Sequence, residues 1–284
     1  MLNKAVVLHH PQSEGAAAFA LRISRDLERA GVTTTVGDVW AKEAPTWLKG
    51  AGLLLCVGGD GSVLRAARLA AGQGTPILGV NMGRLGFLTD ISPESCAELI
   101  PRIVATDWRL EGRVMVHAYL YAPDGSQAGS FEGLNDIVVS RQSPGRPIYV
   151  DLQIDGARLA VYRCDGMIVA TPTGSTGYSL SAGGPILAPT ENHLVVTPVS
   201  AHLALSRSVV VGPETSVELR VTSDHGAILS VDGQEDVPMA SGARVSVSIA
   251  EHVAQFVRFR PPSSFYGELA DKLDVHLSSP SIRA

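Results

Sequence analysis

The sequence predicts an α/β domain followed by a mostly-β domain, and two observations carry this prediction. Over about the first 110 residues, short apolar runs alternate with segments of helical periodicity, which is typical of a parallel, doubly wound sheet. After Leu110 the runs alternate apolar and polar residues instead, and helical periodicity nearly disappears. We therefore predict an α/β domain over 1–110, a β-rich domain over 111–260 and a C-terminal tail over 261–284.

In the first domain, short apolar runs bounded by turn residues predict strands at 4–8, 32–36, 53–57 and 76–80. Apolar residues at helical spacing predict helices at 13–30, 62–71 and 93–105. In parallel α/β sheets, ligands bind beyond the carboxyl ends of the strands. The residues that follow the strand at 53–57 are therefore candidates for a binding site.

In the second domain, strands are expected at 114–121, 137–140, 148–154, 157–163, 166–171, 194–199, 208–211, 216–222, 227–231, 244–249 and 253–259. The pairs Asp124-Gly125, Asp155-Gly156 and Asp232-Gly233 are typical of tight hairpin turns. In the tail, we expect one helical face to dock on another part of the fold, through Phe265, Tyr266, Leu269 and Leu273.

Composition excludes several classes of protein. The chain has 284 residues, 45% of them apolar and 18% charged, which is ordinary for a soluble globular protein. A net charge of -5 and the absence of clustered Lys and Arg argue against nucleic acid as a partner. The three cysteines have no paired spacing, so we expect neither a disulfide framework nor a protein metal site, and a cytoplasmic location fits best. No segment reads as a signal peptide or membrane span, so no membrane partner is expected.

The segment V-G-G-D-G-S at 57–62 carries the strongest chemical signal. A buried strand ends at Gly58-Gly59, and Ser62 opens a helical run, so backbone N–H groups and a helix N-terminus face the turn. Such a turn is suited to phosphate, yet Asp60 would repel phosphate unless it binds a metal ion or accepts a proton from a hydroxyl nucleophile. This conflict indicates phosphoryl transfer, although a G-G-D-G turn alone is also ordinary turn chemistry.

A second Gly-, Ser- and Thr-rich segment, T-P-T-G-S-T-G-Y-S-L-S-A-G-G, spans 171–184 and follows Asp165. We expect its hydroxyls and backbone amides to form a hydrogen-bonding surface for phosphate or ribose, through Thr171, Thr173, Ser175, Thr176, Ser179 and Ser181. Each domain would then supply one glycine-rich loop and one acid, and a cleft between the domains is the expected place for the substrate.

Together these motifs resemble the NAD kinase family. The matching segments are V-G-G-D-G-S at 57–62, N-M-G-R-L-G-F-L-T-D at 81–90, L-N-D at 134–136, D-G-M-I-V-A-T-P-T-G-S-T-G-Y-S-L-S-A-G-G-P-I at 165–186, V-D-G-Q at 231–234 and F-Y-G-E-L-A-D-K-L at 265–273. The long motif from Asp165 to Ile186 is the most specific of them.

The resemblance implies a Rossmann-like first domain, a β-sandwich-like second domain and a tail that returns to the first. It also implies a cytoplasmic homodimer or homotetramer that phosphorylates the adenosine ribose 2′-hydroxyl of NAD to give NADP. ATP would be the phosphoryl donor with a divalent cation, Mg²⁺ by expectation, and the motifs leave open whether inorganic polyphosphate can replace ATP.

On this resemblance Asp60 is the catalytic residue, orienting the hydroxyl or taking its proton, and Gly58, Gly59, Gly61 and Ser62 form the phosphate loop. The residues that would bind NAD are Asp60, Gly61, Arg65, Asn135, Asp136, Arg146, Arg163, Asp165, Thr176, Gly177, Tyr178, Ser179, Leu180, Ser181 and Gln234.

The sequence departs from the family pattern at three positions. Asp136 stands where the family has Glu, Gly177 where it has alanine, and Cys164 where glycine is usual. The Asn135-Asp136 pair is also compatible with a simple turn, and each of the arginines with a solvated surface charge. The cysteine is expected to be a small buried apolar group.

Two other functions remain open at this point. One is another G-G-D-G kinase acting on a sugar phosphate or lipid, which the T-P-T-G-S-T segment disfavours. The other is a non-catalytic dinucleotide sensor, which has no need of an acid such as Asp60 facing phosphate.

Overall fold

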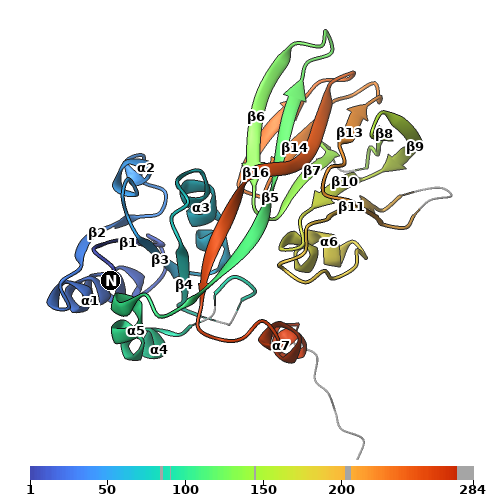
Figure 1. Ribbon diagram of the computed structural model, residues 1–284. Helices are drawn as coiled ribbons and strands as arrows, with labels where there is room; N and C mark the ends of the chain where they lie inside the picture. The colour runs from blue at the N-terminus through green and yellow to red at the C-terminus, as the bar shows by residue number, and fades with distance from the viewer. Residues whose placement is uncertain (84–85, 90, 144, 202–205, 274–284) are drawn as a thin grey trace, which may run out of the picture. The chain divides into compact units, whose positions relative to one another are not determined.

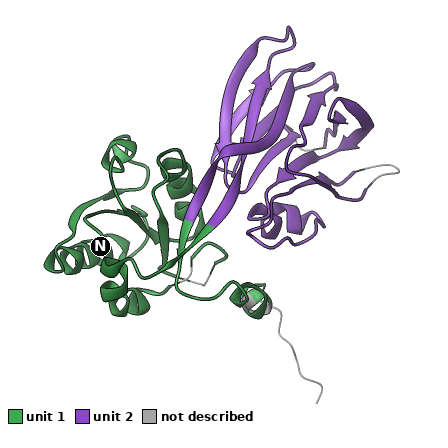
Figure 2. Ribbon diagram, viewed as in Figure 1, with its two compact units in different colours: residues 1–111, 256–284 green, residues 112–255 purple. Residues whose placement is uncertain are grey.

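The computed structural model describes residues 1–83, 86–89, 91–143, 145–201 and 206–273. The chain forms two compact units, one of residues 1–111 and 256–284 and the other of residues 112–255 (Figures 1 and 2). Three residues of the N-M-G-R-L-G-F-L-T-D motif, Arg84, Leu85 and Asp90, lie outside the described residues, as does 274–284 of the expected tail.

The first unit is built on a parallel sheet. Its strands are β1 (Lys4–His9), β2 (Thr33–Asp38), β3 (Leu53–Gly58) and β4 (Ile77–Asn81), in the order β2-β1-β3-β4. The end of β16 (Arg244–Arg258) runs parallel to β4, with Phe256 opposite Ile77. Every residue of β3 and β4 is buried, which explains their continuous apolar sequences.

Helices cover both faces of this sheet (Figure 1). The helix α1 (Ala16–Arg29) packs with Val7, Leu55 and Val57 in one core, together with α5 (Ile100–Ala105). The helix α3 (Asp60–Ala70) contacts β3, β4 and α2 (Ala44–Trp47). The described part of this unit also contains the 3-10 turn η1 (Ala71–Gln73), α4 (Pro93–Glu98) and α7 (Ser264–Lys272). These layers confirm the predicted α/β unit.

Three helices differ in detail from expectation. The first begins at Ala16 because Gly15 has a left-handed backbone, with φ 74°. The helix expected over 93–105 divides into α4 and α5 at Leu99, just before Pro101. In α7, Tyr266 is 67% exposed, so it does not share the half-buried environment of Phe265 and Leu269.

The second unit consists of two packed sheets. One contains β16, β13 (Val217–Val221), β8 (Ile148–Ile154) and β9 (Ala157–Cys164), with β5 (Arg109–Tyr121) and β6 (Gln127–Gly133) joined at β16. The other has the order β12-β11-β10-β7-β14-β15, with bounds Val209–Val211, Leu194–Val199, Gly166–Ala170, Asp136–Arg141, Ala227–Val231 and Glu235–Met239. A single apolar core draws side chains from both sheets, as in a β-sandwich. The predicted β-sandwich-like architecture is therefore confirmed.

The three D-G pairs lie at hairpin turns, as predicted. Asp155 and Gly156 have φ of 50° and 76°, and Asp232 and Gly233 have φ of 53° and 63°, the positive values that a type I′ turn requires. Two strands were missed, β6 and β15, because exposed polar residues interrupt their patterns. The expected strands at 244–249 and 253–259 are the single long strand β16.

Among the described residues of this unit, two short segments are helical, η2 (Gly174–Thr176) and α6 (Tyr178–Ser181). No helix within the described residues has the length and apolar character needed to cross a bilayer.

Candidate functional site

Asp60 begins α3 directly after the end of β3. Its carboxylate accepts the backbone N–H of Phe87 at 2.9 Å and that of Leu88 at 3.2 Å. A Cβ at Gly86 would overlap this carboxylate, so glycine is needed for the close approach. Asp60 is therefore held in one orientation by the segment 86–88. Sequence reasoning missed this contact.

A cavity of about 450 Å³ opens beside this turn in the first unit. It is lined by His10, Gln12, Ser13, Trp40, Gly59, Gly61 and Ser62. Ser62 is 1% exposed, and its Oγ has no hydrogen-bond partner among the described residues. Because α3 starts here, the cavity also faces the positive end of the helix dipole. The arrangement is suited to an anion, as the phosphate loop predicts.

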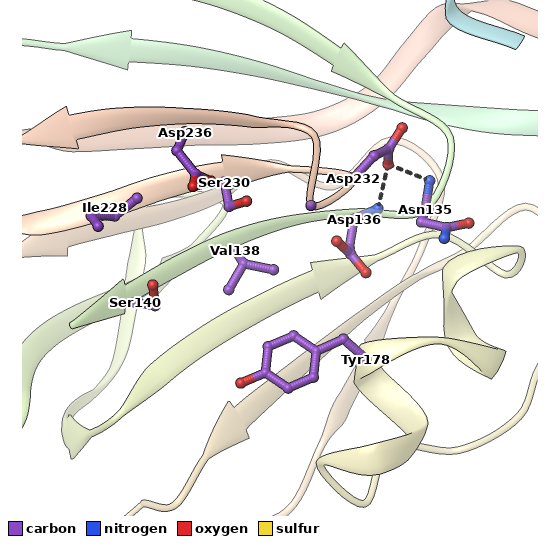
Figure 3. Close-up of a pocket in the computed structure, with 10 residues that line it drawn as sticks. Asn135, Asp136, Val138, Ser140, Tyr178, Ile228, Ser230, Asp232 and Asp236 are labelled. Atoms are coloured by element: carbon purple, nitrogen blue, oxygen red, sulfur yellow. Dashed lines mark hydrogen bonds between the residues drawn. The ribbon is translucent and has the colours of Figure 1, made fainter. Parts of the chain in front are cut away.

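A second cavity, of about 500 Å³, lies in the second unit (Figure 3). On β7 the alternate residues Asp136, Val138 and Ser140 line it, whereas Ile137 and Val139 belong to the core. The same alternation on β14 gives the lining residues Ile228 and Ser230. The remaining lining residues are Asn135, Tyr178, Asp232, Gly233 and Asp236. Figure 3 shows the Tyr178 ring across from Val138 and Asp136.

The carboxylate of Asp232 organises the start of β7. It accepts the backbone N–H of Leu134 at 2.8 Å, of Asn135 at 2.7 Å and of Asp136 at 3.1 Å. Sequence reasoning identified Asp232 only as a turn residue. The signal was present in the V-D-G-Q match, but Gln234 was chosen from it as the ligand-binding candidate.

Asp136 presents a buried carboxyl group to this cavity. The side chain lies at 5% exposure, and burial, with a smaller contribution from the nearby charge of Asp232, raises its pKa from 3.8 to about 7. Beside it, the Oδ1 atom of Asn135 is buried with no hydrogen-bond partner among the described residues. Buried polar atoms of this kind normally have partners, so this oxygen has hydrogen-bonding capacity that the described residues leave unused.

The T-P-T-G-S-T segment differs from the expected hydroxyl surface. Thr171 Oγ1 donates to the carbonyl of Leu134 at 2.6 Å, and Ser175 Oγ donates to that of Pro172 at 2.6 Å. Thr176 Oγ1 donates to the carbonyl of Thr173, and Ser179 bonds Thr197. These hydroxyls therefore stabilise the loop itself. The loop also packs closely on the Asn135 backbone, which a Cβ at Gly174 would overlap. The segment thus positions Asn135 and Tyr178.

The structure brings Asn135, Asp136 and Tyr178 together in one cavity, and Gly59, Gly61 and Ser62 in the other. The other predicted site residues line neither of them. Gly58 is buried where β3 ends, Arg65 lies on α3, and Arg146, Arg163 and Gln234 are exposed. Asp165 pairs with Arg141 at 3.2 Å. Around Tyr178, Thr176, Gly177 and Leu180 are half-buried, Ser179 is buried and Ser181 is exposed.

Within the described residues, no group of three or more His, Cys, Asp or Glu side chains gathers as a metal site would require. The three thiols are free and buried, and burial raises the pKa of Cys164 to about 12. This agrees with the expectation that Cys164 is an apolar filler.

Comparison with known proteins covers nearly the whole chain. Residues 14–108 match the ATP-NAD kinase N-terminal domain, and residues 134–259 match the ATP-NAD kinase C-terminal domain. The NAD kinase of Dehalococcoides mccartyi (strain CBDB1) is 34% identical over 96% of both chains. That of Chloroflexus aggregans is 36% identical over 96% of this chain and 99% of its own.

Solved structures agree with this assignment. The NAD kinase from Archaeoglobus fulgidus in complex with ATP has a TM-score of 0.76 at 29% identity, covering 94% of this chain and 98% of its own. The fold is also that of yeast NADH kinase complexed with NADH, with a TM-score of 0.87 at 22% identity over 100% of this chain and 90% of the other. The chain therefore belongs to the NAD kinase family.

Proposed function

We propose that the protein transfers the γ-phosphoryl group of ATP to the 2′-hydroxyl of the adenosine ribose of NAD, giving NADP and ADP. Membership of the family over both domains supports this reaction. The single structural observation that carries it is the Asp60 carboxylate, held by the N–H groups of Phe87 and Leu88 at the start of a phosphate-binding helix.

Asp60 acts on the acceptor hydroxyl. Two hydrogen bonds use two of the roughly four lone-pair sites of a carboxylate, which leaves acceptor capacity for the hydroxyl proton. Phosphoryl transfer passes through a loose transition state, so little proton transfer is needed before attack and orientation is the larger part of this role. The backbone N–H groups at the start of α3 and Ser62 bind phosphate oxygens.

The cavity of the second unit receives the adenosine of NAD. Asn135 and Asp136 supply amide and carboxyl groups for its polar atoms, and Tyr178, which is 48% exposed, offers a ring for stacking. Asp165, Thr176, Gly177, Ser179, Leu180, Ser181 and Gln234 complete the proposed NAD-binding set, with Arg65, Arg146 and Arg163 neutralising phosphates. The proposal requires Asp60 and this cavity to act on the same NAD molecule.

A divalent cation, Mg²⁺, accompanies ATP in this proposal. The donor set fits such an ion, because Mg²⁺ is usually bound through one or two carboxylates together with substrate phosphates and needs no cage of protein ligands. The phosphate oxygens of ATP would hold it beside the turn Gly59 to Gly61, and Asp60 keeps its role on the acceptor hydroxyl. The ion would supply neutralisation of charge on the transferred group.

We also propose a cytoplasmic homodimer or homotetramer. Free, buried cysteines support a reducing compartment. Light scattering of the purified protein measures the subunit number directly.

The reaction is tested by incubating purified protein with ATP, Mg²⁺ and NAD and detecting NADP with an NADP-specific dehydrogenase. The variant Asp60→Asn should keep NAD affinity and lose turnover by at least about 100-fold, as expected for loss of a positioned acid–base group. In this variant the amide NH₂ group would face one of the two anchoring N–H groups, where wild type has an oxygen that accepts the hydrogen bond. The melting temperature is therefore measured together with the activity, to detect any loss of stability.

The outcomes separate the alternatives. Wild-type protein that binds NAD but forms no NADP would favour the dinucleotide sensor. Turnover of Asp60→Asn equal to that of wild type would remove Asp60 from the mechanism and leave the reaction itself intact.

A further inference from the structure

The cavity of the first unit lies where the strand order of its sheet reverses. From β1 the chain passes outward to β2, then returns to the other side of β1 to form β3 and β4. The helices that follow β1 and β3, α1 and α3, therefore diverge onto opposite faces and leave a crevice at the carboxyl ends of the two strands. His10 and Gln12 follow β1, and Gly59 and Gly61 follow β3, so the lining residues come from both sides of this point.

One end of the cavity is built for phosphate. Ser62, at 1% exposure, lines it with an Oγ that has no hydrogen-bond partner among the described residues, and the turn Gly59 to Gly61 opens α3, a helix of 11 residues. A Cβ at Gly58 would meet Ser62 Oγ at 2.6 Å and His10 Cβ at 3.3 Å, so glycine lets these two side chains approach the end of β3.

The rest of the cavity is bounded by two aromatic rings. His10 and Trp40 form an edge-to-face pair, with ring centroids 4.8 Å apart and an angle of 76° between the ring planes. Trp40 stays 41% exposed, although a ring of this size is normally buried for the most part. Phosphate binding by Gly59, Gly61 and Ser62 does not require an exposed tryptophan in the same cavity.

Backbone N–H groups hold the His10 ring and the main chain at Trp40 in place. The N–H of Gln12 donates to His10 Nδ1 at 3.1 Å, which leaves Nε2 as the donor nitrogen of a neutral ring. The N–H of Trp40 donates to Asp38 Oδ1 at 2.8 Å, and that of Ala41 to the Asp38 carbonyl at 3.0 Å. An aromatic pair is therefore present beside the phosphate end.

We infer that His10 and Trp40 hold the base of the nucleoside triphosphate donor, while Ser62 and the turn before it hold its phosphates. This inference rests on the proposed function and names the donor more closely: a nucleotide is preferred to inorganic polyphosphate because only a nucleotide has a base to stack. Stacking on aromatic rings tolerates every base, so GTP should bind with an affinity close to that of ATP.

Binding is measured by isothermal titration calorimetry of the full chain with ATP and, separately, with inorganic triphosphate, both in Mg²⁺. Trp40→Ala should weaken ATP binding by about tenfold or more, since loss of one stacking ring costs about 1–3 kcal/mol, and should leave triphosphate affinity within about twofold. Trp40→Phe should restore most of the ATP affinity. The matched control is Tyr119→Ala, because Tyr119 also pairs with a histidine, His117, at 4.4 Å but lines neither cavity.

Several results would overturn the inference. They are an ATP affinity unchanged in Trp40→Ala, an equal loss for ATP and triphosphate, a loss confined to NAD, or wild-type protein that binds no ATP. Assays of NADP formation with each donor keep the two proposals apart. Wild-type NADP formation with no effect of Trp40→Ala on donor preference defeats only the inference, whereas Trp40-dependent ATP binding without NADP formation defeats only the proposed reaction.

Discussion

The carboxylate of Asp232 accepts the backbone N–H of Asp136 at 3.1 Å, so it lies beside a second buried carboxyl group. The negative charge of Asp232 disfavours ionisation of the Asp136 side chain. The three N–H groups that Asp232 accepts stabilise its own charge, and Asp136 has no comparable set of backbone donors among the hydrogen bonds described. Two acids in one cavity therefore have different tasks, one holding the loop and the other facing the ligand.

Asp136→Asn should raise stability at neutral and alkaline pH. The folded pKa of about 7 lies above the ordinary 3.8, so the folded state holds the proton more tightly and the free energy of unfolding falls as pH rises from about 4 to about 7. Asparagine removes this ionisation. The gain in the free energy of unfolding over wild type should be smallest near pH 4 and largest at pH 8, reaching on the order of a few kcal/mol. Urea unfolding at a series of pH values measures it. A difference that does not change with pH would contradict the assignment.

Asp232→Asn should destabilise the second unit and weaken NAD binding together. The amide oxygen can accept only part of the hydrogen bonds from Leu134, Asn135 and Asp136, and an unsatisfied buried donor costs about 1–3 kcal/mol. Urea unfolding and NAD titration measure the two effects. Asp236→Asn, at an exposed lining position, is the control, and an equally large loss of stability there would show that the anchor is not specific.

The sequence predicted most of the architecture because buried strands and D-G turns leave local patterns. It predicted Asp60, Asn135, Asp136 and Tyr178 through motifs, but not the partners that fix them. The hydrogen bonds from Phe87 to Asp60 and from Asn135 to Asp232 join residues 27 and 97 positions apart, and such pairings leave no local periodicity. The role of the Thr171 hydroxyl was misjudged for the same reason, since Thr171 bonds Leu134 across 37 positions.

Gly86→Ala should reduce turnover while every charge in the first unit is retained. The added methyl group would overlap the Asp60 carboxylate and displace it from the Phe87 and Leu88 N–H groups. A misplaced catalytic group commonly costs about 100-fold in rate, so kcat should fall by that order with a smaller change in ATP affinity. Gly83→Ala is the control, because its Cβ would meet no atom within 4 Å. Equal activity of the two variants would refute the positional role of Asp60.

The native protein should resist thiol reagents. Cys56, Cys96 and Cys164 are all free and buried, and burial raises the pKa of each to about 12, so almost no thiolate is present at pH 8. Reaction with Ellman's reagent should be slow in buffer and should reach three thiols per chain in guanidinium chloride. Rapid labelling of the native chain would show that at least one thiol is accessible.

Glu111→Ala should strongly destabilise the first unit. Glu111 and Arg258 are 8% and 4% exposed, and Arg258 Nε donates to Glu111 Oε1 at 3.1 Å, which joins the start of β5 to the end of β16. Removing the acid takes the negative charge from beside a buried guanidinium, and breaking such a pair costs about 3–5 kcal/mol. Replacing both residues, in Glu111→Leu with Arg258→Met, should recover part of that loss because the buried guanidinium is removed with its partner. Recovery is incomplete because Arg109, which also bonds Glu111 at 3.2 Å, loses that contact. The exposed pair of Arg29 and Asp26 gives the matched control, for which Asp26→Ala should cost less than about 1 kcal/mol. Chemical denaturation of the four proteins decides the matter, and a loss in Glu111→Ala no larger than that in Asp26→Ala would mean that this ion pair does not stabilise the junction of β5 and β16.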